Sequence, residues 1–335
     1  MNPTKGTELT EREITPAASA ARSEQVAPLL REHLILTPLV KYDVFSEELG
    51  AEVLVKSEHL QRTGSFKARG SMAKILTLTD EQRERGVVTA STGNHGLGVG
   101  NALATLGGHG IAYLPENASP SKVAALRRLG LELRAEGNDS GVLEPKARAY
   151  AAEHDLVYVP PYNDPDIIAG QGTIGVEILE QLGGARLDAV VVAVGGGGLI
   201  SGIASVLKQH LPDIRVYGAS PVRDDAMAAS VRAGKIIQID AQETLSDGTA
   251  GSVEPGSITF DLCRELVDDW VLVSEDAISA ALRMVIDTEH QLIEGSAAMA
   301  LAAARDRRTD LEGQRVAVIS CGGNISSTTL AAALS

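Results

Sequence analysis

Short apolar segments of strand length alternate with segments of helical pattern along this chain, and this alternation is the feature that most restricts its fold. Residues 86–91 (GVVTAS) form a β-branched run, and a helical pattern containing Leu97, Leu103 and Leu106 follows. Further runs that we interpret as strands or helices are 110–115, 121–130, 131–137, 143–155 and 156–161. Such alternation predicts an α/β fold with parallel sheets covered by helices on both faces.

The same alternation starts again after residue 170. The segments that we interpret as helices or strands there are 173–183, 187–194, 199–213, 215–220 and 314–324, followed by a last short helix. We therefore predict a small α/β domain of residues 85–160, inserted into a larger domain made of residues 1–84 and 161–335.

The charge and hydropathy of the chain exclude several kinds of partner. A net charge of −14 over 335 residues disfavours nucleic acid and anionic membranes, which both require a basic face. Apolar runs such as 296–304 are far shorter than the roughly 20 residues of a membrane span, and residues 1–21 lack the apolar core of a secretory signal. Cys263 and Cys321 lack the paired spacing of a disulfide framework or a zinc site. We predict a cytoplasmic protein that binds neither nucleic acid nor membranes.

Three of the predicted strands end in polar or glycine-rich turns, at the edge of the sheet where α/β proteins bind ligands. These turns are 91–96 (STGNHG), 195–198 (GGGG) and 320–324 (SCGGN). A tight turn alone does not need four glycines, whereas backbone amides without Cβ atoms at a helix N-terminus suit a phosphate group. A dinucleotide site fits less well, because Ile200 stands at the third glycine position of that motif and the next strand ends in Ser220 rather than an acid.

The turn 91–96 opens a predicted helix with hydroxyl groups, an amide side chain and backbone N–H groups. These groups suit a carboxylate or another anion. A simple N-cap with a satisfied asparagine would use the same residues, and His95 taken alone is more often structural than a base. The turn is therefore informative only in combination with other motifs.

Lys67 lies inside the run TGSFKARG (63–70). Most lysines are solvated surface cations. Together, however, the chain supplies an amine, a phosphate site, a carboxylate site and a polar turn at the last strand. A cofactor with an aldehyde, a ring and a phosphate would use all of these. Pyridoxal 5′-phosphate is such a cofactor, and its aldehyde forms a Schiff base with lysine.

Motifs that match one family follow each other in the expected order over nearly the whole chain. They are TPLV (37–40), VKSEHLQRTGSFKARG (55–70), STGNHG (91–96), IAGQGTIGVEIL (168–179), GGGGLISG (195–202), SDG (246–248) and SCGGN (320–324). In this combination the chain resembles the fold-type II (tryptophan-synthase-β-like) pyridoxal-phosphate enzymes, within them the serine/threonine dehydratase and serine racemase branch. The resemblance implies a two-domain α/β fold with parallel-rich sheets and the cofactor between the domains.

The resemblance also implies a role for particular residues. Lys67 would form the Schiff base, Phe66 would pack on the ring, Asn94 would bond the 3′-oxygen of the cofactor, and Cys321 would face the pyridine nitrogen. The phosphate would be bound by Gly195, Gly196, Gly197, Gly198 and Leu199. The substrate carboxylate would be held by Ser91, Thr92, Gly93, Asn94 and His95. Asn163 and Glu294 match positions that line the cofactor pocket.

The residue facing the pyridine nitrogen bears on the reaction. A carboxylate there would keep the ring nitrogen protonated and make the ring a strong electron sink. Cys321 cannot impose that charge, which disfavours transamination and favours elimination. The resemblance thus implies that Lys67 removes the α-proton, that the β-hydroxyl departs, and that a 2-oxo acid and ammonia are released.

Some positions depart from the family pattern. Relatives activated by divalent cations carry an acid where this chain has Ser220, and their second acid aligns near Ala226, so we assign no metal. Thr92 replaces the serine that serine racemases use as a second acid/base, and its branched side chain is stiffer, so racemisation is disfavoured. We expect no regulatory C-terminal domain like that of biosynthetic threonine deaminases.

Several alternatives remain open at this stage. The substrate is a small amino acid: L-threonine, L-serine, or another β-hydroxy amino acid such as phenylserine or hydroxyaspartate. A hydroxyectoine-type dehydratase, a serine racemase and a non-catalytic protein that binds the cofactor are the further alternatives. We expect a homodimer or a higher homo-oligomer, which is common in this family.

Overall fold

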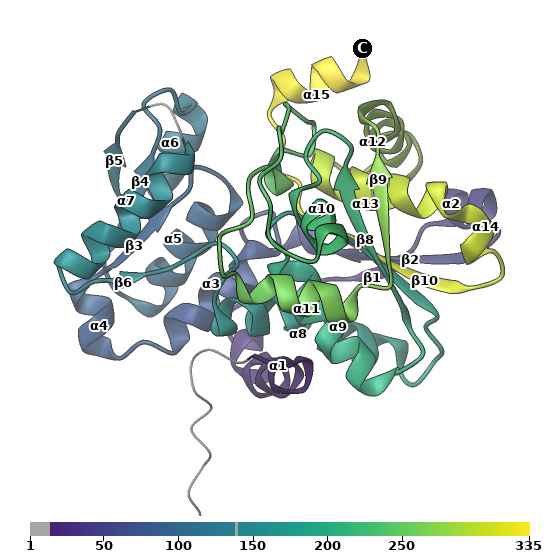
Figure 1. The fold of residues 1–335 in the computed structure, drawn as a ribbon, viewed down its shortest axis with the longest axis horizontal. Coiled ribbons are helices and arrows are strands. Elements are labelled where there is room, and N and C mark those ends of the chain that lie inside the picture. Colours follow the sequence, from purple (N-terminus) through teal and green to yellow (C-terminus); the bar gives the residue numbers. More distant parts are fainter. Residues whose placement is uncertain (1–13, 138–139) are drawn as a thin grey trace, which may run out of the picture.

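Two sheets organise the molecule, and each has its own set of helices (Figure 1). The structure is a computed structural model, and it describes residues 14–137 and 140–335. The larger sheet has six strands in the order β1-β2-β10-β7-β8-β9, and the smaller has four in the order β5-β4-β3-β6. The predicted α/β class is therefore confirmed.

In the larger sheet, every pair of neighbouring strands is parallel except the edge pair of β1 and β2. Its strands are β1 (Leu39–Lys41), β2 (Glu52–Ser57), β7 (Ala189–Ala193), β8 (Arg215–Pro221), β9 (Asp269–Val273) and β10 (Arg315–Ser320). Strands β7 and β10 are buried almost throughout, as expected for central parallel strands covered on both faces.

The smaller sheet is entirely parallel. Its strands are β3 (Val87–Ala90), β4 (Gly110–Leu114), β5 (Glu132–Ala135) and β6 (Val157–Tyr158). Consecutive residues of β3 point to opposite faces: Val87 belongs to one hydrophobic cluster and Val88 to another. The strands predicted at 86–91 and 110–115 are thus confirmed.

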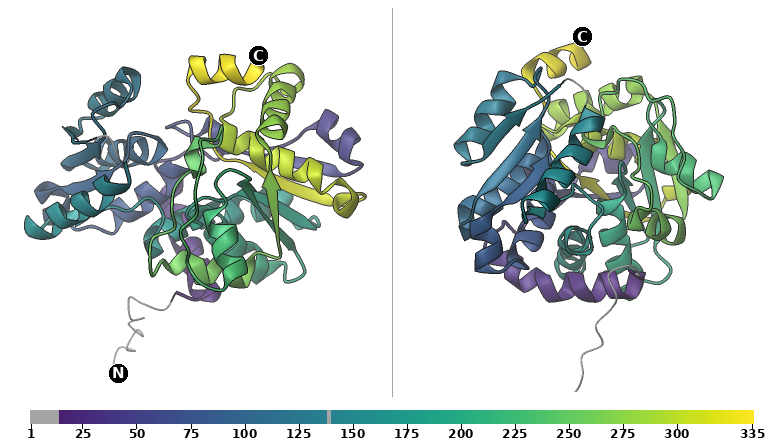
Figure 2. Two further views of the ribbon diagram at one scale, coloured as in Figure 1. Left: turned by 45° about the horizontal axis from the view of Figure 1, so that its top comes forward. Right: turned by 60° about the vertical axis from the view of Figure 1, so that its left-hand side comes forward.

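Helices connect and flank the strands. They are α1 (Pro16–Arg31), α2 (Asp43–Leu49), α3 (Lys67–Leu76), α4 (Asp80–Arg85), α5 (Asn94–Leu106), α6 (Pro120–Arg128), α7 (Ser140–Glu153), α8 (Pro165–Leu182), α9 (Gly198–His210), α10 (Ala226–Ala233), α11 (Ile258–Leu266), α12 (Glu275–Glu289), α13 (Gly295–Asp306), α14 (Arg308–Leu311) and α15 (Ser327–Leu334), with short 3₁₀ turns η1 (Glu58–Leu60) and η2 (Asp247–Thr249). Helix α1 packs along α8 and α9 (Figure 2).

Helix α13 is buried on all sides over Gly295–Ala304 and contacts β7, β8, β9 and β10. Its small, alanine-rich side chains let it lie close to the sheet, and a helix that is apolar all round is expected in the interior. The preceding residue, Glu294, is its N-cap. Burial of α13 therefore fixes the position of Glu294.

The four strands of the smaller sheet all lie within residues 87–158, inside the predicted domain 85–160. Helix α3 packs against this part of the molecule, because Ala68 and Met72 share a hydrophobic cluster with Val99 and Leu103 of α5. The core around the smaller sheet therefore includes residues that precede 85, and the exact domain limits stay a prediction.

Candidate active site

Lys67 is the first residue of α3, and two paired loops hold it in place. The amide of Phe66 donates to the carbonyl of Cys321 at 3.0 Å, and Ser65 forms an isolated antiparallel bridge with Gly322. The side-chain amide of Asn324 also donates to the carbonyl of Thr63 at 2.8 Å. The loop before α3 is thus fastened to the loop after β10, which brings Lys67 near Cys321.

A cavity of about 1360 Å³ extends from Lys67 between residues of the two sheets. It brings together almost all the residues predicted for the site: Phe66, Lys67, Ser91, Thr92, Gly93, Asn94, His95, Gly195, Gly196, Gly197, Gly198, Leu199, Glu294 and Cys321. These residues come from segments up to about 250 positions apart. Their convergence on one cavity agrees with the positions that the family resemblance implies.

Asn163 is the exception, since it does not line the cavity. Its side-chain amide donates to Glu254 at 2.8 Å, and its oxygen accepts from the amide of Ile258 at 3.0 Å. In this structure Asn163 is thus turned toward residues 254–258, and its place in the cofactor pocket stays a prediction. The neighbouring Tyr162 takes the place in the wall, and Asn163 supports the segment 254–258 behind it.

The glycine turn 195–198 is tightly packed against neighbouring residues of the cavity wall. A Cβ atom on Gly196 would lie 2.4 Å from the ring of Tyr162, and one on Gly195 would lie 2.5 Å from the carbonyl of Thr249. Gly197, the N-cap of α9, has a φ of 84°. Packing and backbone conformation therefore both require glycine here.

The same turn also presents the beginning of α9 to the cavity. The first amides of a helix have no partner within the helix, and here Gly198 and Leu199 carry them. Amides at a helix N-terminus attract anions. The turn can thus hold a phosphate group through its backbone.

The turn 91–95 forms another wall, at the N-terminus of α5. The Ser91 hydroxyl accepts from the amide of Gly93 at 3.2 Å. His95 bonds the carbonyl of Val159 through Nε2 at 3.0 Å, so Nε2 carries the proton. Burial lowers the pKa of His95 to about 3, which keeps the ring neutral and leaves Nδ1 as an acceptor. The hydroxyls and amides of the turn, rather than His95, are then the donors available to a carboxylate.

Asn94 is held by two partners on the far side of the cavity. Its Nδ2 donates to the Glu294 carboxylate at 3.0 Å, and its Oδ1 accepts from Asn324 at 2.7 Å. An amide nitrogen has two protons, so one of them can still reach a ligand. Burial raises the pKa of Glu294 to about 7. The Asn94 side chain is therefore fixed in orientation and still able to donate.

The Lys67 amine donates to the carbonyl of Pro161 at 2.7 Å and lies 5.3 Å from the centre of the Phe66 ring. Burial lowers its pKa to about 8, and attraction to Glu144 and other acidic groups limits this shift. A larger share of neutral amine is therefore present near neutral pH than in an exposed lysine. Neutral amine is the form that attacks an aldehyde.

Cys321 is buried at the end of β10. Burial raises the pKa of its thiol well above the ordinary value, so the group is a neutral thiol. A neutral side chain at this point agrees with the prediction that no charge is imposed on a ring nitrogen there.

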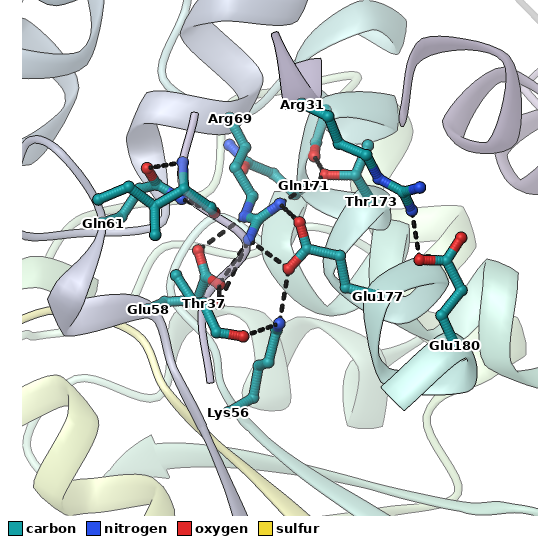
Figure 3. Close-up of polar contacts among 12 residues, drawn as sticks. Arg31, Thr37, Lys56, Glu58, Gln61, Arg69, Gln171, Thr173, Glu177 and Glu180 are labelled. Carbon is teal, nitrogen blue, oxygen red and sulfur yellow. Dashed lines mark hydrogen bonds and ion pairs between the residues drawn. The ribbon is translucent and has the colours of Figure 1, made fainter. Parts of the chain in front are cut away.

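A buried ion cluster anchors the helix that carries Lys67 (Figure 3). Arg69 donates to Glu58 at 2.7 Å and to Glu177 of α8 at 2.7 Å. Lys56 of β2 bonds Glu177 at 2.5 Å and the carbonyl of Thr37 at 2.7 Å. Two cations and two carboxylates, all nearly inaccessible, thus join α3 to the larger sheet and to α8.

Sequence reasoning missed several polar side chains of the cavity. Glu144 and Arg148 from α7, Tyr162, and Lys122 from α6 line it. These residues lie outside the motifs. The pattern of α7 predicts a helix, but nothing in it indicates that this face borders a ligand site.

Two findings concern metals and membranes. Within residues 14–137 and 140–335, no three His, Cys, Asp or Glu side chains are grouped so as to hold a metal ion. In the same part of the chain, no helix has both the length and the apolar character of a membrane span. Residues 1–13 of the segment predicted to lack a secretory signal lie outside the described residues.

Comparison with known proteins agrees with this geometry. Residues 30–322 match the family of pyridoxal-phosphate dependent enzymes. The chain therefore belongs to this family, and pyridoxal phosphate is its cofactor.

Individual relatives are more specific. The chain is 40% identical to the L-threonine ammonia-lyase of Thermotoga maritima over 289 residues, which cover 86% of this chain and 71% of that protein. It is also 40% identical to the catabolic L-threonine dehydratase TdcB of Escherichia coli over 291 residues, 86% of this chain and 88% of that one.

Solved structures with similar folds include a threonine deaminase and a serine racemase. The processed form of threonine deaminase isoform 2 from Solanum lycopersicum superposes with a TM-score of 0.89 at 32% identity, over 99% of this chain and 93% of that one. Serine racemase from Dictyostelium discoideum superposes with a TM-score of 0.84 at 32% identity, over 92% and 98%. The two-domain fold-type II architecture predicted from the motifs is thereby confirmed.

Proposed function

We propose that this protein catalyses α,β-elimination of water from a β-hydroxy amino acid, L-threonine and/or L-serine, and that hydrolysis of the resulting enamine gives a 2-oxo acid and ammonia. The observation that carries this proposal is the arrangement around one cavity: the Lys67 amine, the N-terminus of α9, the turn 91–95 and the neutral Cys321. The relatives at 40% identity, both named for threonine, support the substrate.

Bound pyridoxal phosphate supplies an aldehyde for an amine and a conjugated ring that stabilises negative charge at Cα. The amides of Gly198 and Leu199 would hold its phosphate, and Asn94 would donate to its 3′-oxygen. Phe66 would pack beside the ring, and Cys321 would face its nitrogen without adding charge.

Lys67 has two tasks in the proposed reaction. Its amine would form the covalent link to the cofactor, and once the substrate amine has displaced it, it would take the α-proton. The turn 91–95 would bind the substrate carboxylate through hydroxyl and amide donors, which would fix Cα beside Lys67. The β-hydroxyl would leave as water, taking up a proton as its C–O bond breaks with both electrons on oxygen, and hydrolysis of the product enamine would consume one water and release the 2-oxo acid and ammonia.

The purified protein, supplied with pyridoxal phosphate, should release 2-oxobutyrate from L-threonine and pyruvate from L-serine. Release of ammonia in equal amount distinguishes elimination from transamination. Rapid racemisation of L-serine without 2-oxo acid would instead support the racemase alternative. Absence of reaction with every β-hydroxy amino acid would contradict the proposal.

The remaining parts of the proposal concern location, metal content and oligomeric state. We propose that the enzyme is cytoplasmic, that it binds no metal, and that it forms a homodimer or a higher homo-oligomer. Exposed apolar side chains around η1 support self-association: Leu60 and Leu292 adjoin His59 and Gln291, which lie 3.3 Å apart. Light scattering after size-exclusion chromatography measures the mass, and a monomer would contradict this assignment.

A further inference from the structure

One face of helix α7 forms a wall of the cavity that no step of the proposed reaction uses. The residues of α7 that line the cavity are Glu144, Pro145, Arg148, Ala149 and Ala152. Positions separated by three or four residues lie on one side of a helix. The wall thus combines two charged side chains with small alanines that leave room for a ligand.

Glu144 is held in a defined position on this wall. The Tyr158 hydroxyl donates to its carboxylate at 3.0 Å. Glu144 and Lys67 line the same cavity, and among the groups that oppose the burial-induced lowering of the Lys67 pKa, Glu144 contributes most. Burial raises the pKa of Glu144, whereas the Tyr158 hydrogen bond and the charges of Arg148 and Lys67 favour its ionised form.

Two cations of the described cavity wall, Arg148 and Lys122, already have acidic partners. Arg148 pairs with Glu254 at 2.8 Å and lies 4.5 Å above the ring of Tyr158. Lys122 lies 3.9 Å from Asp247. The third cation is Lys67 itself, which the reaction occupies. The acidic lining residues, by contrast, are Glu144, Asp247, Glu254 and Glu294.

This step rests on the proposed function, which places the α-carboxylate at the turn 91–95, the phosphate at α9 and the ring against Cys321. The walls without a role in that proposal are α7, residues 119–125, residues 247–255 and the segment after β10. Of these, we assign α7 to the substrate side chain, because Glu144 on it interacts with Lys67, the group that would take the α-proton.

We infer that Glu144 selects substrates by their side chain: it accepts a hydrogen bond from a side-chain hydroxyl and repels a second carboxylate. The substrates that fit are neutral β-hydroxy amino acids. A β-hydroxy amino acid with a side-chain carboxylate, L-threo-3-hydroxyaspartate, is excluded by charge rather than by size.

The test compares the enzyme loaded with its cofactor and its Glu144→Gln variant. Glutamine keeps the shape and can still accept from Tyr158, so only the charge is lost. The quantity compared is the ratio of kcat/KM for L-threo-3-hydroxyaspartate to kcat/KM for L-threonine. In the variant this ratio should rise at least about tenfold, mainly because the KM for L-threo-3-hydroxyaspartate falls when the repulsion is removed. The matched control is Glu153→Gln, an exposed position of the same helix outside the cavity wall, which should leave the ratio unchanged.

A second measurement needs no turnover. L-aspartate and L-asparagine have almost the same shape, and their binding to the loaded enzyme changes the absorbance of the cofactor. Glu144→Gln should strengthen binding of L-aspartate about tenfold, one decade in the dissociation constant, and leave L-asparagine unaffected. Unchanged L-aspartate binding, or a wild-type preference for hydroxyaspartate over threonine, would overturn the inference. Failure of the enzyme to eliminate any substrate would overturn the proposed function, while the binding comparison would still decide the role of Glu144.

Discussion

The Lys67 amine donates a hydrogen bond to the carbonyl of Pro161, 94 residues further along the chain, at 2.7 Å. Pro161 directly precedes Tyr162, whose ring packs against the glycine turn of the phosphate site. The amine proposed to react and the turn proposed to bind the phosphate are therefore positioned by adjacent residues of one loop. A displacement of this loop would alter both.

Replacing Lys67 by alanine should abolish covalent attachment of the cofactor and lower elimination by several orders of magnitude, because we assign both tasks to its amine. Borohydride reduction followed by peptide mapping should find the cofactor on Lys67 in the wild type. Lys41→Ala, at an exposed lysine, is the control and should behave like the wild type. Near-normal turnover by Lys67→Ala would refute the assignment.

The reactivity of Lys67 should depend on pH in a particular way. Burial lowers its pKa to about 8, so protein freed of its cofactor should bind pyridoxal phosphate faster as the pH rises through about 8, with little further gain above that. An unshifted lysine would keep gaining up to about pH 10.4. Stopped-flow absorbance measures this rate. A profile without a plateau below pH 9.5 would contradict the shift.

Removing Arg69 should destabilise the protein strongly. Arg69→Met leaves two buried carboxylates with only Lys56, and the loss of one partner from a buried ion pair costs about 3–5 kcal/mol. Urea unfolding monitored by circular dichroism measures the change. Arg31→Met is the matched control, because Arg31 pairs with Glu180 at an exposed site, where a pair contributes about 0–1 kcal/mol. Equal losses in the two variants would show that the cluster does not anchor α3.

Enlarging Gly196 should weaken cofactor binding through Tyr162. In Gly196→Ala the new methyl group would lie 2.4 Å from the ring, so the ring or the turn must move, and we expect at least about a tenfold rise in the dissociation constant of pyridoxal phosphate. Adding Tyr162→Ala to this variant removes the collision and should recover part of the affinity relative to Gly196→Ala alone. A folded Gly196→Ala protein with normal affinity would contradict this account.

The residue beside the ring nitrogen should affect the chemistry more than the fold. Cys321→Ser stays neutral and should remain active, whereas Cys321→Asp would favour a protonated ring nitrogen and should lose most elimination activity. Rates with L-threonine and cofactor absorbance spectra separate the two variants. Identical rates and spectra would show that position 321 does not tune the reaction.

The sequence was informative where a function depends on a local run of residues. The turns at 91–96 and 195–198 could be proposed because they follow predicted strands and are rich in polar residues or glycine, and Lys67 could be proposed from its combination with these turns. The structure adds a second reason for the glycines: Tyr162 and Thr249 fill the space where their side chains would lie.

The residues that could not be predicted depend on contacts between distant segments. The exposure of Glu144 to the cavity follows from the packing of α7 against the smaller sheet, and its pattern alone does not reveal it. The partners of Asn163 could not be predicted for the same reason, since Glu254 and Ile258 lie about 90 residues further on. The edge strand β1 has only three residues, too few to produce a recognisable alternation.

The pairing of the loop before α3 with the loop after β10 has a consequence for how the enzyme matures. Asn324 and Thr63, which it joins, are separated by 261 residues, and contacts at such separation form late because closing long loops costs chain entropy. We therefore expect Lys67 to reach its final surroundings only after β10 has entered the sheet between β2 and β7. Capture of the cofactor would then follow this late pairing, and a partly folded chain would be spared premature reaction with a free aldehyde.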